Sequence, residues 1–196
     1  MIAPVGILFA VLGYLLGSVM FSYWLGRAVG QDIRILGDGN PGAVNVFRAA
    51  GWKLGVAALL LDFLKGFVPV FWFVRLYGLG SPWLVPVAMA PVLGHAFSLF
   101  HRFQGGKAVN VTFGVWSGLM LWEAPVVLGL ALVLLKFVLR VRNDARSVML
   151  GMACLLVFVL VRRPAPVLIA VFLLNLAVLL AKHRYELRGR PGARPV

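Results

Sequence analysis

The sequence has little cysteine and little negative charge. Its 196 residues include one cysteine, Cys154, which excludes an internal disulfide, and no group of Cys and His has the spacing of a zinc site. We therefore expect no metal and no cofactor. Six Asp and Glu stand against 19 Lys and Arg, but the basic residues lie between apolar runs and near the C-terminus rather than on one amphipathic face. This distribution argues against nucleic-acid binding.

The chain also lacks the polar surface of a water-soluble protein. Only 13% of its residues are charged and 62% are hydrophobic, which is typical of a polytopic membrane protein. The N-terminus has no basic stretch followed by a small-residue cleavage site, so we expect the first apolar run to be kept as a helix. The composition predicts an all-α polytopic membrane protein, with one domain over residues 1–196.

Apolar runs predict about seven transmembrane helices. As one helix, residues 108–140 would be about 50 Å long at ~1.5 Å per residue, which exceeds a ~30 Å membrane core, so we expect a break near Pro125. The first piece, 108–122, is short, and both a full span and a re-entrant segment stay open. Pro82, Pro86 and Pro91 predict a kinked or broken third helix. The predicted spans are 4–26, 55–77, 81–100, two within 108–140, 147–161 and 165–181, followed by a basic tail, Lys182 to Arg194.

Positive charge predicts the orientation of these spans. With the N-terminus outside and the C-terminus cytoplasmic, the outer loops hold only Arg75, Arg162 and Arg163, as the positive-inside rule requires. The inner side then holds Arg27, Arg34, Arg48, Lys53, Arg102, Lys107, Arg140, Arg142, Arg146, Lys182, Arg184, Arg188, Arg190 and Arg194.

Within the first span, Gly13 and Gly17 have the GxxxG spacing that lets another helix pack closely.

A glycine- and asparagine-rich loop, Gly37 to Arg48, follows the first span. Glycines allow successive backbone N–H groups to turn inward and form an anion-binding nest, and arginine adds a charged fork suited to phosphate. An ordinary turn between helices is the alternative. The residues of this loop predicted to bind phosphate are Gly37, Gly39, Asn40, Gly42, Asn45 and Arg48.

A second loop, Gly94 to Lys107, again joins an open backbone to a positive charge, at Gly105, Gly106 and Lys107. Two phosphate-binding loops in one small membrane protein suggest a phosphorylated substrate. His95 lies near this loop, and we expect a structural role for it because no carboxylate is placed in sequence to orient it.

Asp62 and Lys65 lie in the second predicted span. They share a helical face, since they are three residues apart, and charges at membrane depth are costly unless they face the bundle or a wet cavity. A packing ion pair and a role in the site stay open.

Together these motifs resemble the bacterial acyl-phosphate-dependent glycerol-3-phosphate acyltransferases, the PlsY family of integral membrane enzymes. The resemblance runs along most of the chain. It is carried by Gly17-Ser18, Gly26-Arg27, Asp32-Ile33-Arg34, the loop Gly37 to Arg48, Asp62 to Gly66, Gly94-His95-Ala96-Phe97, Phe100, Gly105-Gly106-Lys107 and His183-Arg184.

The resemblance implies transfer of a fatty acyl group from acyl phosphate to the 1-hydroxyl of glycerol 3-phosphate, which gives lysophosphatidic acid in phospholipid biosynthesis. It implies a monomer in the bacterial inner membrane, with membrane lipid around it and the site on the cytoplasmic face. A histidine-dependent acyltransferase is disfavoured because no His-x-x-x-x-Asp is present. The implied catalytic residues are Lys107, Arg48, Asn45 and His183, and the implied phosphate-binding residues are Gly37, Asp38, Gly39, Asn40, Gly42, Gly105 and Gly106.

The chain departs from the family pattern at several positions. Asp38 stands where such relatives carry Ser, and Glu186 where they carry Asn, so two carboxylates enter a phosphate site. Like charges about 4 Å apart cost on the order of 4 kcal/mol at an effective dielectric of 20. The basic neighbours in sequence that could offset this are Arg34 and Arg48 for Asp38, and Arg184 or Arg188 for Glu186, and the sequence leaves open whether they do. The further departures are Val44 for Thr, Ser98 for Pro and Ala108 for Gly.

These departures favour an alternative function: a paralogue with the same fold but lost or altered catalysis, acting as a membrane binding or lipid-handling protein. A small transporter is a weaker alternative, because the sequence contains no evident inverted repeat.

Overall fold

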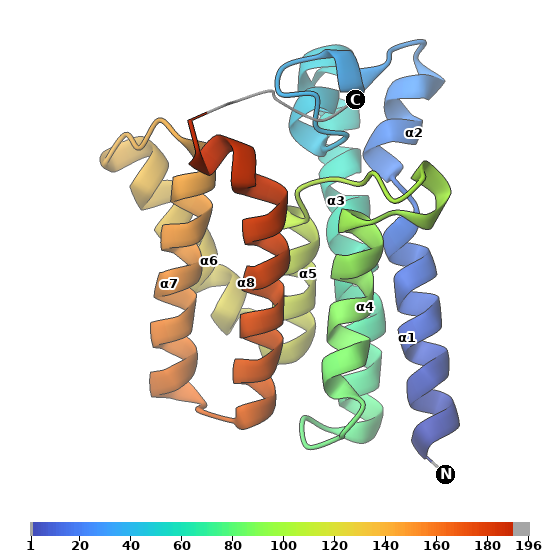
Figure 1. The fold of residues 1–196 in the computed structure, drawn as a ribbon, viewed down its shortest axis with the longest axis vertical. Helices are drawn as coiled ribbons and strands as arrows, with labels where there is room; N and C mark the ends of the chain where they lie inside the picture. Colours follow the sequence, from blue (N-terminus) through green and yellow to red (C-terminus); the bar gives the residue numbers. More distant parts are fainter. Residues whose placement is uncertain (1, 190–196) are drawn as a thin grey trace.

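The computed structural model describes residues 2–189, which fold as a bundle of helices without β-strands in that range (Figure 1). Arg190 and Arg194 of the predicted tail lie outside the described residues. The elements are α1 (Ile2–Ser18), α2 (Phe21–Ala28), η1 (Ile33–Ile35), α3 (Ala43–Tyr77), α4 (Leu84–Ala96), η2 (Leu99–His101), α5 (Val109–Met120), α6 (Glu123–Val133), η3 (Leu134–Val138), α7 (Asp144–Arg162) and α8 (Pro166–Leu187).

Five helical segments among the described residues are long and apolar enough to cross a membrane: Ala3–Ala28, Ala43–Tyr77, Leu84–His101, Asp144–Arg162 and Pro166–Leu187. Helices α5 and α6 have 12 and 11 residues. At ~1.5 Å per residue, each spans less than 20 Å, roughly two thirds of a membrane core. The all-helical membrane class is confirmed, whereas the seven-span count and the orientation of the termini stay predictions.

Several predicted boundaries were wrong. The first predicted span, 4–26, agrees with the observed segment Ala3–Ala28, but its helix is interrupted between α1 and α2, where Met20 has non-helical dihedral angles. The first glycine loop ends early, because the chain is helical from Ala43 onward and bends at Gly51, whose φ of 77° only glycine adopts readily. Helix α4 is not broken, since it runs from Leu84 to Ala96 with Pro91 inside. Helix α8 continues to Leu187, so the first part of the predicted tail, residues 182–187, is helical.

Close packing of α1 on α4 depends on glycine. A Cβ atom at Gly17 would lie 2.5 Å from the carbonyl oxygen of Pro91, and one at Gly94 would lie 2.2 Å from that of Tyr14. The predicted close helix contact at Gly17 is therefore confirmed, with α4 as the partner. This contact sets the position of the C-terminal end of α4, where the second loop begins.

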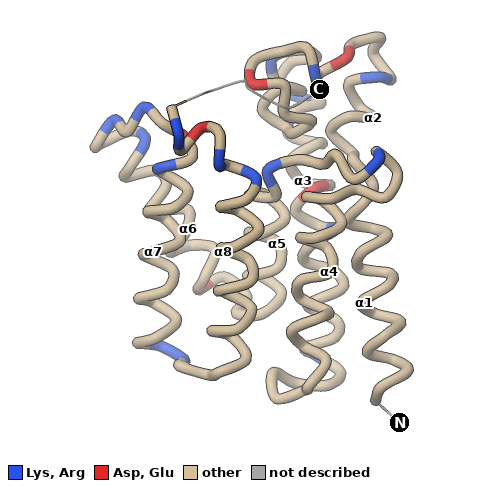
Figure 2. Tube along the Cα trace, in the orientation of Figure 1, with Lys and Arg blue, Asp and Glu red and all other residues tan. Residues whose placement is uncertain are grey.

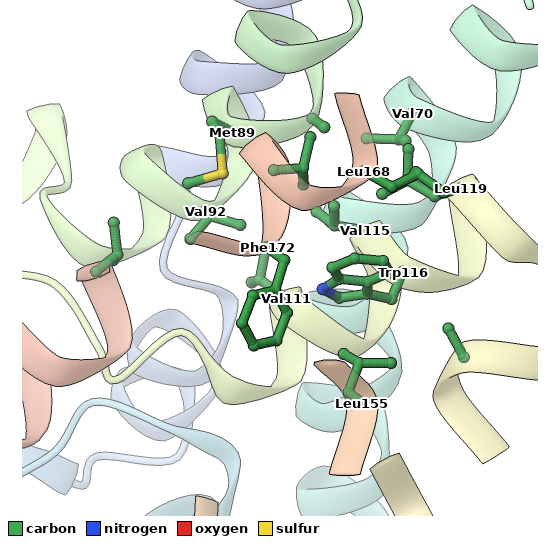
Figure 3. Packing of buried hydrophobic residues seen from close by; sticks show 14 of the residues in the cluster. Val70, Met89, Val92, Val111, Val115, Trp116, Leu119, Leu155, Leu168 and Phe172 are labelled. Atoms are coloured by element: carbon green, nitrogen blue, oxygen red, sulfur yellow. The ribbon is translucent and has the colours of Figure 1, made fainter. Parts of the chain in front are cut away.

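The core lies between α3, α4, α5, α7 and α8, and Trp116 is its largest fully buried side chain (Figure 3). Its indole Nε1 donates to Asn175 Oδ1 at 3.2 Å, and Asn175 Nδ2 donates to Thr112 Oγ1 at 3.0 Å. Phe172 packs edge-on against the indole. This buried network fixes α5 against α8, and so fixes the start of α5 relative to the C-terminal end of α8.

The two glycine loops and the C-terminal end of α8 lie at the same end of the bundle, opposite the N-terminus (Figure 1). Figure 2 shows that most Lys and Arg also gather there, while a smaller basic group marks the turn between α7 and α8 at the other end. Segments far apart in the sequence thus meet at one basic end of the molecule.

Candidate active site

Asn45 organises the first glycine loop. This buried residue lies in the first turn of α3, and its Nδ2 donates to the carbonyl oxygens of Leu36 and Asn40, at 2.9 Å each, and to Asp38 Oδ1 at 3.1 Å. Its Oδ1 accepts from Arg48 Nη1 at 3.1 Å. The amide therefore holds the loop and positions Arg48, and the catalytic role that resemblance implies for Asn45 stays a prediction.

Glycine at position 37 makes room for the arginine. Gly37 has φ 54°, and a Cβ atom there would lie 1.9 Å from Arg48 Nη1. Three N–H groups of the predicted nest are already bonded within the loop, because Gly39 N donates to Leu36 O, Asn40 N to Asp38 Oδ1 and Gly42 N to Asn40 O. The start of α3 offers an anion site instead, since first-turn N–H groups lack intrahelical acceptors and attract negative charge.

The second loop packs on α4 by backbone hydrogen bonds. Gly105 N donates to Ala96 O at 3.2 Å and Gly106 N to His95 O at 3.0 Å. Cβ atoms at these glycines would lie 1.9 Å from His95 O and 2.3 Å from His95 Nε2, respectively. Both glycines therefore have a packing role that delivers Lys107 to the site, and the phosphate contact that resemblance implies for them stays a prediction.

Lys107 joins the two unusual carboxylates. Its Nζ donates to Asp38 Oδ2 at 2.5 Å and to Glu186 Oε1, so one lysine ties the first loop to the end of α8. Among residues 2–189, the arginines near Asp38 and Glu186 in sequence form no ion pair with these carboxylates. Arg34 instead pairs with Asp32 at 2.7 Å, and its hydrogen bonds lower the pKa of Asp32 to about 2.

The pKa of Asp38 is set by two opposed effects. Burial raises the pKa of this carboxyl, but the hydrogen bond and charge of Lys107 oppose it, together with donors from Asn40 and Asn45. The balance holds the pKa of Asp38 below its usual value. Asp38 is therefore a carboxylate at neutral pH, which accepts hydrogen bonds and donates none.

His183 faces the site from α8. It is 2% exposed, and its Nδ1 lies 2.8 Å from the carbonyl oxygen of Leu179. A carbonyl oxygen only accepts hydrogen bonds, so the proton resides on Nδ1 and a neutral His183 has Nε2 as an acceptor. The backbone of α8 thereby fixes both the tautomer and the orientation of the ring.

These groups surround one cavity of about 830 Å³. Its polar residues come from both loops, from α3, α4 and α5, from the segment before α7 and its first residue, and from the end of α8, and its apolar residues come mainly from α3, α5 and α7. The lining residues are Gly37, Asp38, Asn40, Gly42, Ala43, Val44, Asn45, Arg48, Leu59, Asp62, His95, Lys107, Ala108, Val109, Asn110, Phe113, Arg142, Asn143, Asp144, Val148, His183 and Glu186. Such a cavity can hold a charged head and an apolar tail together.

A buried ionic network adjoins this cavity. Lys65 Nζ lies 2.8 Å from Asp62 Oδ1 and donates to Val19 O at 2.8 Å, where α1 breaks. Ser22 Oγ donates to Asp62 Oδ2 at 2.7 Å, and His95 Nδ1 lies 3.9 Å from Asp62 Oδ1. The pair therefore holds the gap between α1 and α2 and also borders the site, which combines the two roles left open by the sequence.

Most predicted site residues meet at the cavity, with three exceptions. Gly39, Gly105 and Gly106 do not line it. Sequence reasoning missed Arg142 and Asn143, which precede α7, because a basic stretch between helices also marks topology. Within residues 2–189, no group of three or more His, Cys, Asp or Glu could hold a metal ion.

The family model described as "Glycerol-3-phosphate acyltransferase" matches residues 7–189. The chain is 40% identical over 187 residues to glycerol-3-phosphate acyltransferase 1 of Thermotoga maritima, which covers 89% of this chain and 92% of the relative. It is 35% identical over 183 residues to the glycerol-3-phosphate acyltransferase of Geobacter sulfurreducens, covering 93% and 92%.

Two solved structures are also similar to this chain. A crystal structure of PlsY, an integral membrane glycerol 3-phosphate acyltransferase in its glycerol 3-phosphate form, has a TM-score of 0.87 at 30% identity, covering 97% of this chain and 96% of the other. The lysophosphatidic acid form of PlsY has a TM-score of 0.85, again at 30% identity, covering 95% and 93%.

Proposed function

This chain belongs to the glycerol-3-phosphate acyltransferase family, and we propose that it moves a fatty acyl group from an acyl phosphate to the 1-hydroxyl of glycerol 3-phosphate. The products are lysophosphatidic acid, a precursor of phospholipids, and inorganic phosphate. The observation that carries the proposal is the single cavity in which Arg48, Lys107 and His183 meet an apolar wall.

The reaction requires no covalent intermediate on the protein. An acyl phosphate is already activated, so the enzyme has to hold two phosphorylated partners together and neutralise charge that moves onto the leaving phosphate. Arg48 and the start of α3 hold one phosphate group, since a planar guanidinium suits phosphate oxygens and a helix start attracts anions. Lys107 neutralises the leaving phosphate, and Arg142 provides a second cation at the cavity wall.

The rest of the cavity suits the other parts of the substrates. His183 lines the cavity with Nδ1 bonded to the backbone, so its Nε2 is the acceptor that orients the glycerol moiety. Leu59, Val109, Phe113 and Val148 form an apolar wall from α3, α5 and α7, along which the acyl chain lies before it passes between helices into lipid. Apolar burial contributes roughly 0.8 kcal/mol per CH₂ group, so this wall favours a long-chain donor.

We place the cavity at the cytoplasmic face of the bacterial inner membrane, with the protein as a monomer. Lys and Arg gather at the cavity end of the bundle, as the positive-inside rule expects of cytoplasmic loops (Figure 2). Soluble glycerol 3-phosphate enters from this side, and the acyl donor enters from the membrane.

The experiment measures phosphate release by the purified, detergent-solubilised protein given palmitoyl phosphate, with and without glycerol 3-phosphate. We expect release that depends on glycerol 3-phosphate and yields lysophosphatidic acid by mass spectrometry. Palmitoyl coenzyme A, supplied in place of palmitoyl phosphate, tests the donor class, and we expect no product from it.

No release above that of a Lys107→Met variant, from protein shown to be folded, would contradict the proposal. The non-catalytic paralogue is not favoured by the comparisons, and its main support is weakened because Asp38 and Glu186 are both paired with Lys107.

A further inference from the structure

Asp38 and Glu186 are two of the four carboxylates that line a cavity that has to accept phosphate groups. Ionised carboxylates and phosphate oxygens are all hydrogen-bond acceptors, so they cannot bond to one another. An acyl phosphate dianion has no O–H or N–H group to donate. The remaining donors on the two substrates are the hydroxyls of glycerol 3-phosphate, so Asp38 and Glu186 have only these hydroxyls as productive partners among the substrates.

The two carboxylates differ in the acceptor capacity that they have left. Asp38 Oδ1 accepts from Asn40 N and Asn45 Nδ2, and Asp38 Oδ2 accepts from Lys107. Glu186 Oε1 accepts from Lys107, whereas Glu186 Oε2 is buried and has no hydrogen-bond donor among residues 2–189. A buried acceptor without a donor costs about 1–3 kcal/mol, which a substrate hydroxyl would relieve.

We propose that Glu186 is a catalytic residue that contacts the acceptor, which rests on the proposed function. Its carboxylate accepts a hydrogen bond from the 1-hydroxyl of glycerol 3-phosphate and takes up the proton as the hydroxyl oxygen attacks the acyl carbon. The O–H bond breaks, the ester C–O bond forms, and the bond between the acyl carbon and the phosphate oxygen breaks. Phosphate leaves with that electron pair and then receives the proton from Glu186.

The surroundings of Glu186 fit this task. Lys107 from the second loop donates to one oxygen of the Glu186 carboxylate and also neutralises the leaving phosphate. The group that takes up the proton and the phosphate that finally receives it therefore lie beside the same cation. Asn143 Nδ2 donates to the backbone carbonyl of Glu186 at 2.9 Å and fixes this part of α8. The other titratable or charged groups at the same cavity are Asp38 from the first loop, Arg48 and Asp62 from α3, His95 from α4, Arg142, Asp144 at the start of α7, and His183 one turn earlier on α8.

Proton acceptance requires a carboxylate, which an amide cannot replace. The test therefore compares kcat and KM for glycerol 3-phosphate, between pH 5 and 9, in the wild type, Glu186→Gln and Glu186→Asp. Glu123→Gln is the matched control, because Glu123 pairs with Arg162 and does not line the cavity. Thermal unfolding and size-exclusion profiles check that each variant is folded.

We expect Glu186→Gln to lower kcat by about 100-fold, with a much smaller change in KM, because general base catalysis contributes roughly 10² to 10⁴ in rate. Glu186→Asp should retain more activity than Glu186→Gln, and Glu123→Gln should match the wild type. Added formate should restore part of the rate of Glu186→Ala, which a purely structural role would not allow.

Two results would overturn the role of Glu186. A Glu186→Gln enzyme with wild-type kcat and an unchanged pH profile would show that no proton passes to this residue. A Glu186→Gln enzyme with a higher kcat/KM for glycerol 3-phosphate than the wild type would show that the carboxylate only hinders phosphate binding. If the wild type itself makes no lysophosphatidic acid, the proposed function fails and this inference falls with it, whereas an active wild type confines any failure to Glu186.

Discussion

Lys107 and Asp38 are 69 residues apart in the sequence, yet Nζ of the lysine lies 2.5 Å from Oδ2 of the aspartate. The lysine side chain is 17% exposed and also bonds to Glu186 on α8. This contact therefore connects three distant segments at the basic end of the bundle. Salt screens such a partly buried charge pair less than a surface pair.

Replacing Lys107 should affect both activity and stability. Lys107→Met leaves two carboxylates facing each other without a counter-charge, so we expect a lower unfolding temperature and a loss of about 10² to 10³ in kcat. Adding Asp38→Asn and Glu186→Gln to this variant should restore the unfolding temperature but not the rate. Lys53→Met, an exposed lysine of α3 that does not line the cavity, is the control. Wild-type kcat in Lys107→Met would contradict the proposed role of the lysine.

Stability should depend on pH through Asp38. Its folded pKa is lowered below the ordinary value of 3.8, so its ionised form stabilises the protein fully above that value. The contribution is lost as pH falls through the lowered pKa. We therefore expect a gap in unfolding temperature between the wild type and Asp38→Asn at pH 6 that narrows below about pH 4. Thermal unfolding in detergent at both pH values measures this, and a gap that widens on acidification would contradict it.

The buried pair of Asp62 and Lys65 should show strong non-additivity. Removal of one partner leaves an unpaired charge beside the break between α1 and α2, which costs about 3–5 kcal/mol. We expect Asp62→Asn and Lys65→Met each to lower the unfolding temperature more than the double variant does. A double-mutant cycle measures the coupling, and purely additive effects would show that the two charges do not stabilise each other.

Gly106 should not tolerate a methyl group. A Cβ atom there would lie 2.3 Å from His95 Nε2, so Gly106→Ala has to displace either the histidine or the loop that carries Lys107. We expect this variant to lose most of its activity while its helix content by circular dichroism stays the same. Gly80→Ala is the matched control, because no atom lies within 4 Å of the corresponding Cβ position. An active Gly106→Ala enzyme would mean that the loop can shift without harm.

Sequence reasoning was most successful for residue types that chemistry restricts. Arg48 and Lys107 were identified because cations beside glycine loops favour phosphate chemistry, His183 was implied by the family resemblance, and all three line the cavity. It was least successful for backbone N–H groups. Whether the N–H of Gly106 is free or bonded to His95 O depends on where α4 ends, and local sequence does not carry that information.

By itself, the sequence determined the membrane class, the apolar helices and the basic end of the chain, because hydropathy, helix spacing and charge are local properties. The tertiary structure decided which charges meet. From the sequence, Asp38 and Glu186 are two carboxylates in a phosphate site, and Arg34 and Arg184 are nearby basic residues that could neutralise their negative charge. Packing of α5 on α8 and of the second loop on α4 instead delivers Lys107 to both. Electrostatic partners are set by distance in space, which only the folded chain defines.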